Sequence, residues 1–258
     1  MGKFSNMTTA RQFLRAALLG SIATLLAAPG GGAAEISYDG CLSRARETPE
    51  QGLEQALAWR DAGGGDAARH CVAIALLNLG RAGLAAERLE LLAGDMAGRP
   101  ATARAEVLAQ AGNAWLIAGN AARADAALST ALELAPDDPD LLIDRARALA
   151  LARNYGRAFA DLDRAVALAP DRVDALVFRA AARRQLDDRE RALEDVELAL
   201  ALAPDDIDAL IERGILYRLA GRDDAARADW LKVLELAPDD PAGDTARANL
   251  ERLDLKPE

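Results

Sequence analysis

The chain has 258 residues, of which 51% are hydrophobic, 28% are charged and only 4% are aromatic. This is ample apolar material for a folded body, and a formal net charge of −10 opposes binding to nucleic acid or anionic lipid. The sequence has no basic patch with interleaved aromatic residues, so we expect no nucleic-acid partner.

Residues 1–34 have the composition of a secretory signal peptide. Three basic residues precede an apolar run over residues 16–28, and a proline and small residues follow it. We therefore expect a periplasmic or secreted protein, cleaved after Ala34, and Met7 is an alternative start that leaves a basic segment before the run. An uncleaved membrane anchor is the other interpretation, but this run is too short to span a bilayer. No membrane span is expected in the mature chain.

Residues 35–99 predict helical hairpins with an irregular pattern. Thr48 begins a capping-box sequence, and Pro49 would occupy the first helical position. The three glycines at 63–65 are interpreted as a break between helices rather than as a phosphate loop, because no accompanying lysine is present.

Cys41 and Cys71 are the only cysteines, an even count for an exported chain. If the hairpins of residues 35–99 stack, both cysteines lie on first helices of neighbouring hairpins, and we predict a disulfide between them. Two buried thiols are the alternative, and a reactive pair would lack the usual Cys-x-x-Cys spacing. His70, the only histidine, is expected on a helix surface, because four ligands at zinc spacings are absent. We expect no metal and no cofactor.

Residues 100–240 contain a repeat with a period of 34 residues. Each unit ends in Leu-Ala-Pro-Asp after an apolar helical run, with the prolines at 136, 170, 204 and 238. A fixed period of this length indicates a solenoid of helix-turn-helix units. The units are 105–138, 139–172, 173–206 and 207–240.

Other positions recur when the units are aligned on their prolines. Small residues alternate with larger apolar ones, so that two helices can approach closely while bulky side chains fill the gaps between hairpins. The small positions are Gly112, Ala146, Ala180 and Gly214, then Ala124, Ala158, Ala192 and Ala226; the larger ones are Leu108, Leu142, Leu176 and Leu210, then Leu128, Leu162, Val196 and Trp230.

This pattern resembles the tetratricopeptide repeat (TPR) family over four complete units. The resemblance implies an all-α fold, a right-handed α-solenoid of helix-turn-helix repeats, with residues 241–258 as a C-terminal capping helix and tail. The sequence departs from the family pattern where arginine occupies a slot often given to leucine or to an aromatic residue. These arginines are Arg145, Arg179, Arg213 and Arg183.

Helix boundaries within the repeats are marked by polar residues and glycine. Asp138 and Asp240 fit as N-caps, each followed by a proline whose missing N–H costs nothing at the first helical position. Gly119 and Gly221 are predicted to end the first helix of their hairpins.

In TPR proteins the first helices of the hairpins line a concave surface that typically holds peptides. By this resemblance we expect a groove that suits an extended or helical segment with apolar anchors and some acidic character. The alternative is that several of these side chains pack within the solenoid. The expected groove residues are Asn113, Ile143, Arg147, Val177, Phe178, Arg184, Ile211, Ile215 and Arg218.

The sequence therefore predicts a non-catalytic scaffold or adaptor that binds a partner protein or peptide. A catalytic role is not expected, because a Ser-His-acid relay would depend on His70 alone and no phosphate-binding loop is present. The alternative is a structural subunit of a cell-envelope assembly or maturation complex, acting through self-association. The identity of the partner is not encoded in any motif.

Overall fold

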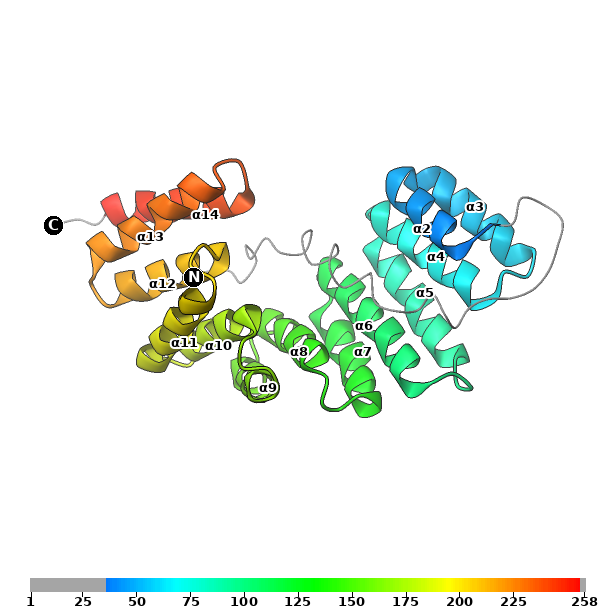
Figure 1. The fold of residues 1–258 in the computed structure, drawn as a ribbon, viewed down its shortest axis with the longest axis horizontal. Helices are drawn as coiled ribbons and strands as arrows, with labels where there is room; N and C mark the ends of the chain where they lie inside the picture. The colour runs from blue at the N-terminus through cyan, green and yellow to red at the C-terminus, as the bar shows by residue number, and fades with distance from the viewer. Residues whose placement is uncertain (1–35, 256–258) are drawn as a thin grey trace. The chain divides into compact units, whose positions relative to one another are not determined.

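The computed structural model describes residues 36–255, and over these residues it contains thirteen α-helices and no strand (Figure 1). The predicted all-α class is confirmed. The predicted signal peptide and its cleavage point lie outside the described residues. The chain forms two compact units, which comprise residues 36–148 and 149–255 of the described part, and each unit is considered by itself.

The N-terminal unit consists of helices that each contact the next along the chain from α2 to α7. Helix α2 also contacts α4, so the first three helices share one interior. The helices are α2 (Tyr38–Glu47), α3 (Pro49–Asp61), α4 (Gly65–Asn78), α5 (Ala82–Asp95), α6 (Ala101–Ile117), α7 (Ala121–Leu134) and most of α8 (Pro139–Leu151).

In the C-terminal unit, too, each helix contacts the next along the chain, from α9 to α14, which Figure 1 shows in yellow-green to red. Its first helices also contact one another, α10 with α12 and α12 with α14, so they form one face that we call the first-helix face. The helices are α9 (Tyr155–Leu168), α10 (Val173–Gln185), α11 (Arg189–Leu202), α12 (Ile207–Leu219), α13 (Asp223–Leu236) and α14 (Pro241–Asp254).

The recurring small residues lie where paired helices approach most closely. A Cβ added to Gly112 on α6 would come within 2.5 Å of Cγ of Leu128 on α7. A Cβ added to Gly214 on α12 would overlap the indole of Trp230 on α13, which is fully buried. The helix pairs therefore pack by setting a small residue against a large one, as the sequence pattern predicted.

The predicted caps are confirmed at two of three helices. The Asp138 carboxylate accepts from the backbone N–H of Asp140 at 2.9 Å, and the Asp240 carboxylate accepts from that of Ala242 at 2.9 Å. The prediction of a capping box at Thr48 was wrong, because the Thr48 side chain makes no capping hydrogen bond to α3. The Thr48 hydroxyl donates back to the Arg44 carbonyl at 3.4 Å, because α2 ends directly before this residue and its last carbonyls need donors.

The turns inside the hairpins adopt a left-handed backbone conformation. Gly119 and Gly221 have φ of 74°, which confirms their predicted role. One period away from these glycines, Arg153 has φ of 61° and Asp187 has φ of 66°. A side chain makes this conformation costly, so these two positions are strained where glycine would not be.

We expect Asp187→Gly to stabilise the C-terminal unit by about 0.5 kcal/mol, because relief of the left-handed strain outweighs the added chain entropy of glycine. The exposed Asp187–Arg189 ion pair, lost in the variant, contributes little. Gly221→Ala is the matched opposite change and should cost about 1 kcal/mol. Urea unfolding followed by circular dichroism measures both, and a loss of stability in the first variant would contradict the strain argument.

A disulfide joins the first and third helices of the N-terminal unit. Cys41 on α2 is bonded to Cys71 on α4, with 6.3 Å between their Cα atoms, and both residues are fully buried. The predicted pairing is confirmed. It holds the short helix α2 against the rest of the unit.

The expectation that His70 lies on a helix surface was wrong. Its side chain is only 3% exposed and bridges three helices, with the Tyr38 hydroxyl 2.7 Å from Nδ1 and the Gln110 Oε1 2.6 Å from Nε2. Because an amide oxygen only accepts, Nε2 donates to Gln110 and Nδ1 accepts from Tyr38. Burial lowers the pKa of His70, which keeps the ring neutral at neutral pH.

Candidate functional site

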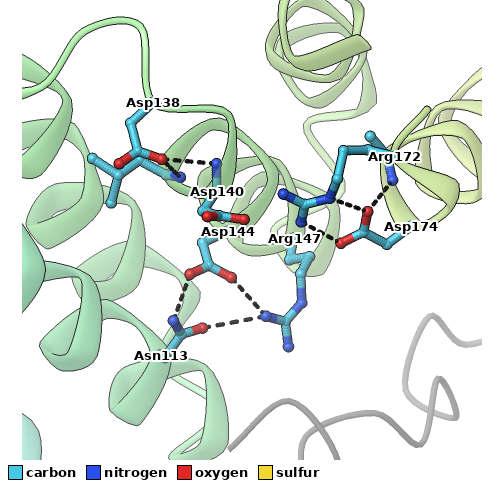
Figure 2. A network of polar contacts seen from close by, with 9 residues as sticks. Asn113, Asp138, Asp140, Asp144, Arg147, Arg172 and Asp174 are labelled. Carbon is cyan, nitrogen blue, oxygen red and sulfur yellow. Dashed lines mark hydrogen bonds and ion pairs between the residues drawn. The ribbon is translucent and has the colours of Figure 1, made fainter. Parts of the chain in front are cut away.

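The predicted groove residues of the N-terminal unit form a polar network rather than an open binding surface. Figure 2 shows the Asp144 carboxylate between the side chains of Asn113 and Arg147. Asn113 donates to Asp144 at 2.5 Å, and Arg147 donates to Asp144 at 2.8 Å and to the Asn113 amide oxygen at 3.2 Å. The charge of Arg147 is therefore offset within the chain.

Burial dominates the electrostatics of this network. It raises the pKa of Asp144, while the charge of Arg147 and the hydrogen bond from Asn113 oppose the shift. Ile143 beside it is buried. The network joins α6 to α8 and presents little apolar surface to a ligand.

In the C-terminal unit, the predicted apolar residues divide by helix. Val177 and Phe178 on α10 are only 2% and 8% exposed, so they pack within the unit. Ile211 and Ile215 on α12 are partly exposed. The accessible apolar surface of the first-helix face therefore lies on α12.

The two predicted arginines of this unit also differ. Arg184 on α10 donates to both oxygens of the buried Glu212 on α12, at 2.5 and 3.1 Å. Arg218, at the end of α12, has no hydrogen-bond or ion-pair partner among residues 36–255. Of these two cations, only Arg218 is available to a partner.

A carboxylate that was not assigned to the groove completes this surface. Asp208 lies in the first turn of α12, three residues before Ile211, and the described part of the chain provides it with no hydrogen-bond or ion-pair partner. Residues spaced by three and four lie on one side of a helix. We call the set Asp208, Ile211, Ile215 and Arg218 the α12 stripe.

Buried acidic residues on the second helices were also missed. Arg179 on α10 donates to both oxygens of Asp195 on α11, at 2.9 and 2.6 Å, and Arg183 adds a third bond at 2.7 Å. Arg213 and Asp229 pair in the same way at 2.9 and 2.6 Å. These arginines hold the hairpins together, and an Arg–Asp spacing of 16 residues that recurs with the repeat is the signal that could have revealed them.

The described residues contain neither a metal-binding cluster nor a membrane-spanning helix. No group of three or more His, Cys, Asp or Glu side chains within residues 36–255 could hold a metal ion. No helix in the same range is long and apolar enough to cross a membrane.

Comparison with known proteins identifies the fold by structure alone. No protein family matches the sequence, and no curated protein is significantly similar to it. Many solved structures do match, and TPR proteins are among them. The chain therefore has the all-α fold of tetratricopeptide-repeat proteins.

Three of these structures illustrate the similarity. The TPR protein TTC0263 of Thermus thermophilus has a TM-score of 0.59 at 22% identity, over 72% of this chain and 100% of its own. MamA from Desulfovibrio magneticus RS-1 has a TM-score of 0.56 at 22% identity, over 72% and 96%. YrrB, a TPR protein described as having an unusual peptide-binding site, has a TM-score of 0.54 at 16% identity, over 80% and 99%.

Proposed function

We propose that the chain is a non-catalytic adaptor of the periplasm that holds a segment of a partner protein on the first-helix face of its C-terminal unit. The α12 stripe is the observation that carries this proposal. Its two isoleucines are partly exposed, and they lie between two charged side chains that have no partner within residues 36–255. Partly exposed apolar anchors flanked by charge suit the capture of a peptide segment.

The fold supports this role. Stacked helix pairs present their first helices as a preformed surface, so a partner segment can bind without first ordering the receptor. YrrB, which has the same fold, has a peptide-binding site. The proposed mechanism is therefore recognition by a rigid face, with no chemical step.

The periplasmic part of the proposal rests on two features. The first is the signal-peptide composition of residues 1–34. The second is the Cys41–Cys71 disulfide, because disulfides persist in oxidising compartments and are rare in the cytosol. Recovery of the tagged chain in the periplasmic fraction, with the leader removed, tests this part.

We expect the double variant Ile211→Ala with Ile215→Ala to bind partner peptides at least about tenfold more weakly, because each truncation removes about 1 kcal/mol of apolar burial at the interface. Phe178 is a poorer choice for this test, since it is buried and its loss would also affect stability. The measurement is selection of a random peptide library by the purified chain, followed by affinity measurements on the recovered peptides.

The matched control is Leu198→Ala, which truncates an exposed apolar residue on the second helix α11. This variant should bind the recovered peptides like the natural chain, and both variants should keep their helical content. If the natural chain recovers no peptide, or if the two variants bind equally well, the adaptor proposal is wrong.

A structural role through self-association is the second candidate. It is favoured by exposed leucines on the second helices of the C-terminal unit, among them Leu198, Leu202, Leu231 and Leu236. Exposed apolar side chains of this kind could bury surface against a second copy of the chain. Light scattering measures the oligomeric state. A stable oligomer that Leu231→Glu converts to a monomer would support this candidate, whereas a monomeric natural chain would contradict it.

A further inference from the structure

The α12 stripe has opposite charges at its two ends. Asp208 lies in the first turn of α12 and Arg218 in the last, with Ile211 and Ile215 between them on the same side. The two charged residues are ten positions apart, which corresponds to about 15 Å along a helix. A ligand that follows this stripe meets a carboxylate, then apolar surface, then a guanidinium.

The carboxylate end of the stripe, Asp208, pairs with no cation in the part of the chain that the structure describes. One repeat earlier, two of the guanidinium nitrogens of Arg172 donate to the Asp174 carboxylate, at 3.0 and 2.8 Å. One period of 34 residues after Arg172 the chain has Asp206, which adds a second negative charge near Asp208. The Asp206 carboxylate accepts from the backbone N–H of Ala209. Asp240 lies near as well and caps Ala242.

These neighbours make ionised Asp208 unfavourable in the free protein. Burial, followed by the negative charges of Asp206 and Asp240, raises the pKa of Asp208 to about 6. Asp208 is therefore still mostly ionised at neutral pH, and no cation among residues 36–255 pairs with it.

The guanidinium end of the stripe, Arg218, also differs from the other arginines of the first helices α10 and α12. The other arginines on the first helices α10 and α12 are bound to carboxylates of the chain, whereas Arg218 has no such partner among the residues described. The carboxylate nearest to it along α12, Glu212, is already bound to Arg184. Both ends of the stripe thus have a charge available for a ligand.

We propose that the α12 stripe binds an extended segment of the partner in which a basic and an acidic side chain are four residues apart, with an apolar side chain midway. In an extended chain, residues i, i+2 and i+4 lie on one side and span about 13 Å, which matches the stripe. The basic residue pairs with Asp208, the apolar one packs on Ile211 and Ile215, and the acidic one pairs with Arg218. This inference rests on the adaptor function and specifies its ligand.

The charges of Asp208 and Arg218 could instead have a purely structural role, and the stability of a variant distinguishes the two explanations. Acidic residues near the start of a helix and basic residues near its end are stabilised by the helix dipole. If that were the role of Asp208, Asp208→Asn would lower the midpoint temperature of unfolding at neutral pH. If Asp208 instead serves to bind a cation of the partner, it is uncompensated in the free protein. Asp208→Asn then raises the midpoint temperature, because it removes the repulsion from Asp206 and Asp240. Asp174→Asn is the matched control and should lower it, because it removes the charge of the carboxylate to which Arg172 is bound.

Binding is tested with peptides recovered from the random library by the natural chain. We expect enrichment of opposite charges four residues apart around an apolar residue, in one order along the peptide. The charge-swapped variant Asp208→Arg with Arg218→Asp should bind these peptides at least about tenfold more weakly and should select the reversed order. The peptide with glutamine at both charged positions should lose a similar factor.

Several results would contradict the proposed charge pattern of the ligand but would still be consistent with the adaptor function. Recovered peptides without the charge pattern, or with charges spaced for a helical ligand, would overturn it. The inference would also be wrong if the charge-swapped variant binds the recovered peptides with unchanged affinity, or if Asp208→Asn lowers the midpoint temperature of unfolding. The adaptor function fails separately, when no peptide is recovered or when the Ile211→Ala, Ile215→Ala variant binds normally.

Discussion

Replacing Trp230 with alanine should lower the free energy of unfolding by about 3 to 5 kcal/mol, the largest effect that we expect from one substitution in this chain. The indole is fully buried between α13 and α12, where it fills the space left by Gly214. Its N–H also points to the Ile211 carbonyl at 3.4 Å. Alanine would leave a cavity that the neighbouring helices can close only in part.

Urea unfolding monitored by circular dichroism measures this loss. Leu231→Ala is the control, because it removes an exposed apolar side chain from the next position of the same helix and should change stability by less than about 0.5 kcal/mol. Equal stability of the two variants would show that the small–large pairing does not hold this hairpin together.

The same pairing predicts a coupling between Gly214 and Trp230. Gly214→Ala alone should destabilise the chain, since the added methyl group overlaps the indole. In a Trp230→Val background the alanine should be tolerated, because the preceding repeat has Ala180 and Val196 at these two positions. A double-mutant cycle therefore should give a non-additive result.

The repeat pattern predicted helices, caps and turns well because these depend on nearby residues. Asp138 and Asp240 cap the helices that follow them within a few positions, and the left-handed turns at Gly119 and Gly221 need only a residue without Cβ. The disulfide was predictable because stacking brings first helices of neighbouring hairpins together. Local chemistry and the period were sufficient in each case.

Burial of polar groups was not predictable in this way. His70 is satisfied by Tyr38 and Gln110, which are 32 and 40 residues away, so nothing near it in sequence distinguishes a buried ring from an exposed one. Asp195 is buried where two arginines from the neighbouring helix reach it, and in the sequence only the recurring 16-residue spacing from Arg179 indicates this. Such long-range satisfaction is a property of the packed structure.

The exposure of the predicted groove residues was also not predictable from the sequence alone. The resemblance to TPR proteins indicates which side of each first helix faces the groove, but exposure depends on the size of the neighbouring side chains. Phe178 is therefore buried while Ile215 is partly exposed. Of the two arginines predicted for the groove of the C-terminal unit, internal pairing leaves only Arg218 available, since Arg184 is bound to Glu212. The expected preference for acidic partners is thus replaced by a proposed need for both charges.

Removing the disulfide should cost about 3.6 kcal/mol, as the chain-entropy estimate gives for a loop closed over 30 residues. Alanine at both Cys41 and Cys71 is the suitable variant, because serine would bury two hydroxyl groups at positions with no solvent exposure. The loss should concentrate at α2, since a helix of 10 residues is unstable by itself and would retain only its packing and the Tyr38–His70 hydrogen bond.

Hydrogen exchange resolves where this loss occurs. In the double alanine variant, and in the natural chain under reducing conditions, the amides of α2 should exchange faster, while those of α12 and α13 keep their protection. The affinity for recovered peptides should also be unchanged, because the α12 stripe belongs to the other unit. Unaltered exchange at α2 would mean that packing alone holds this helix, and loss of peptide binding would mean that the two units are energetically coupled.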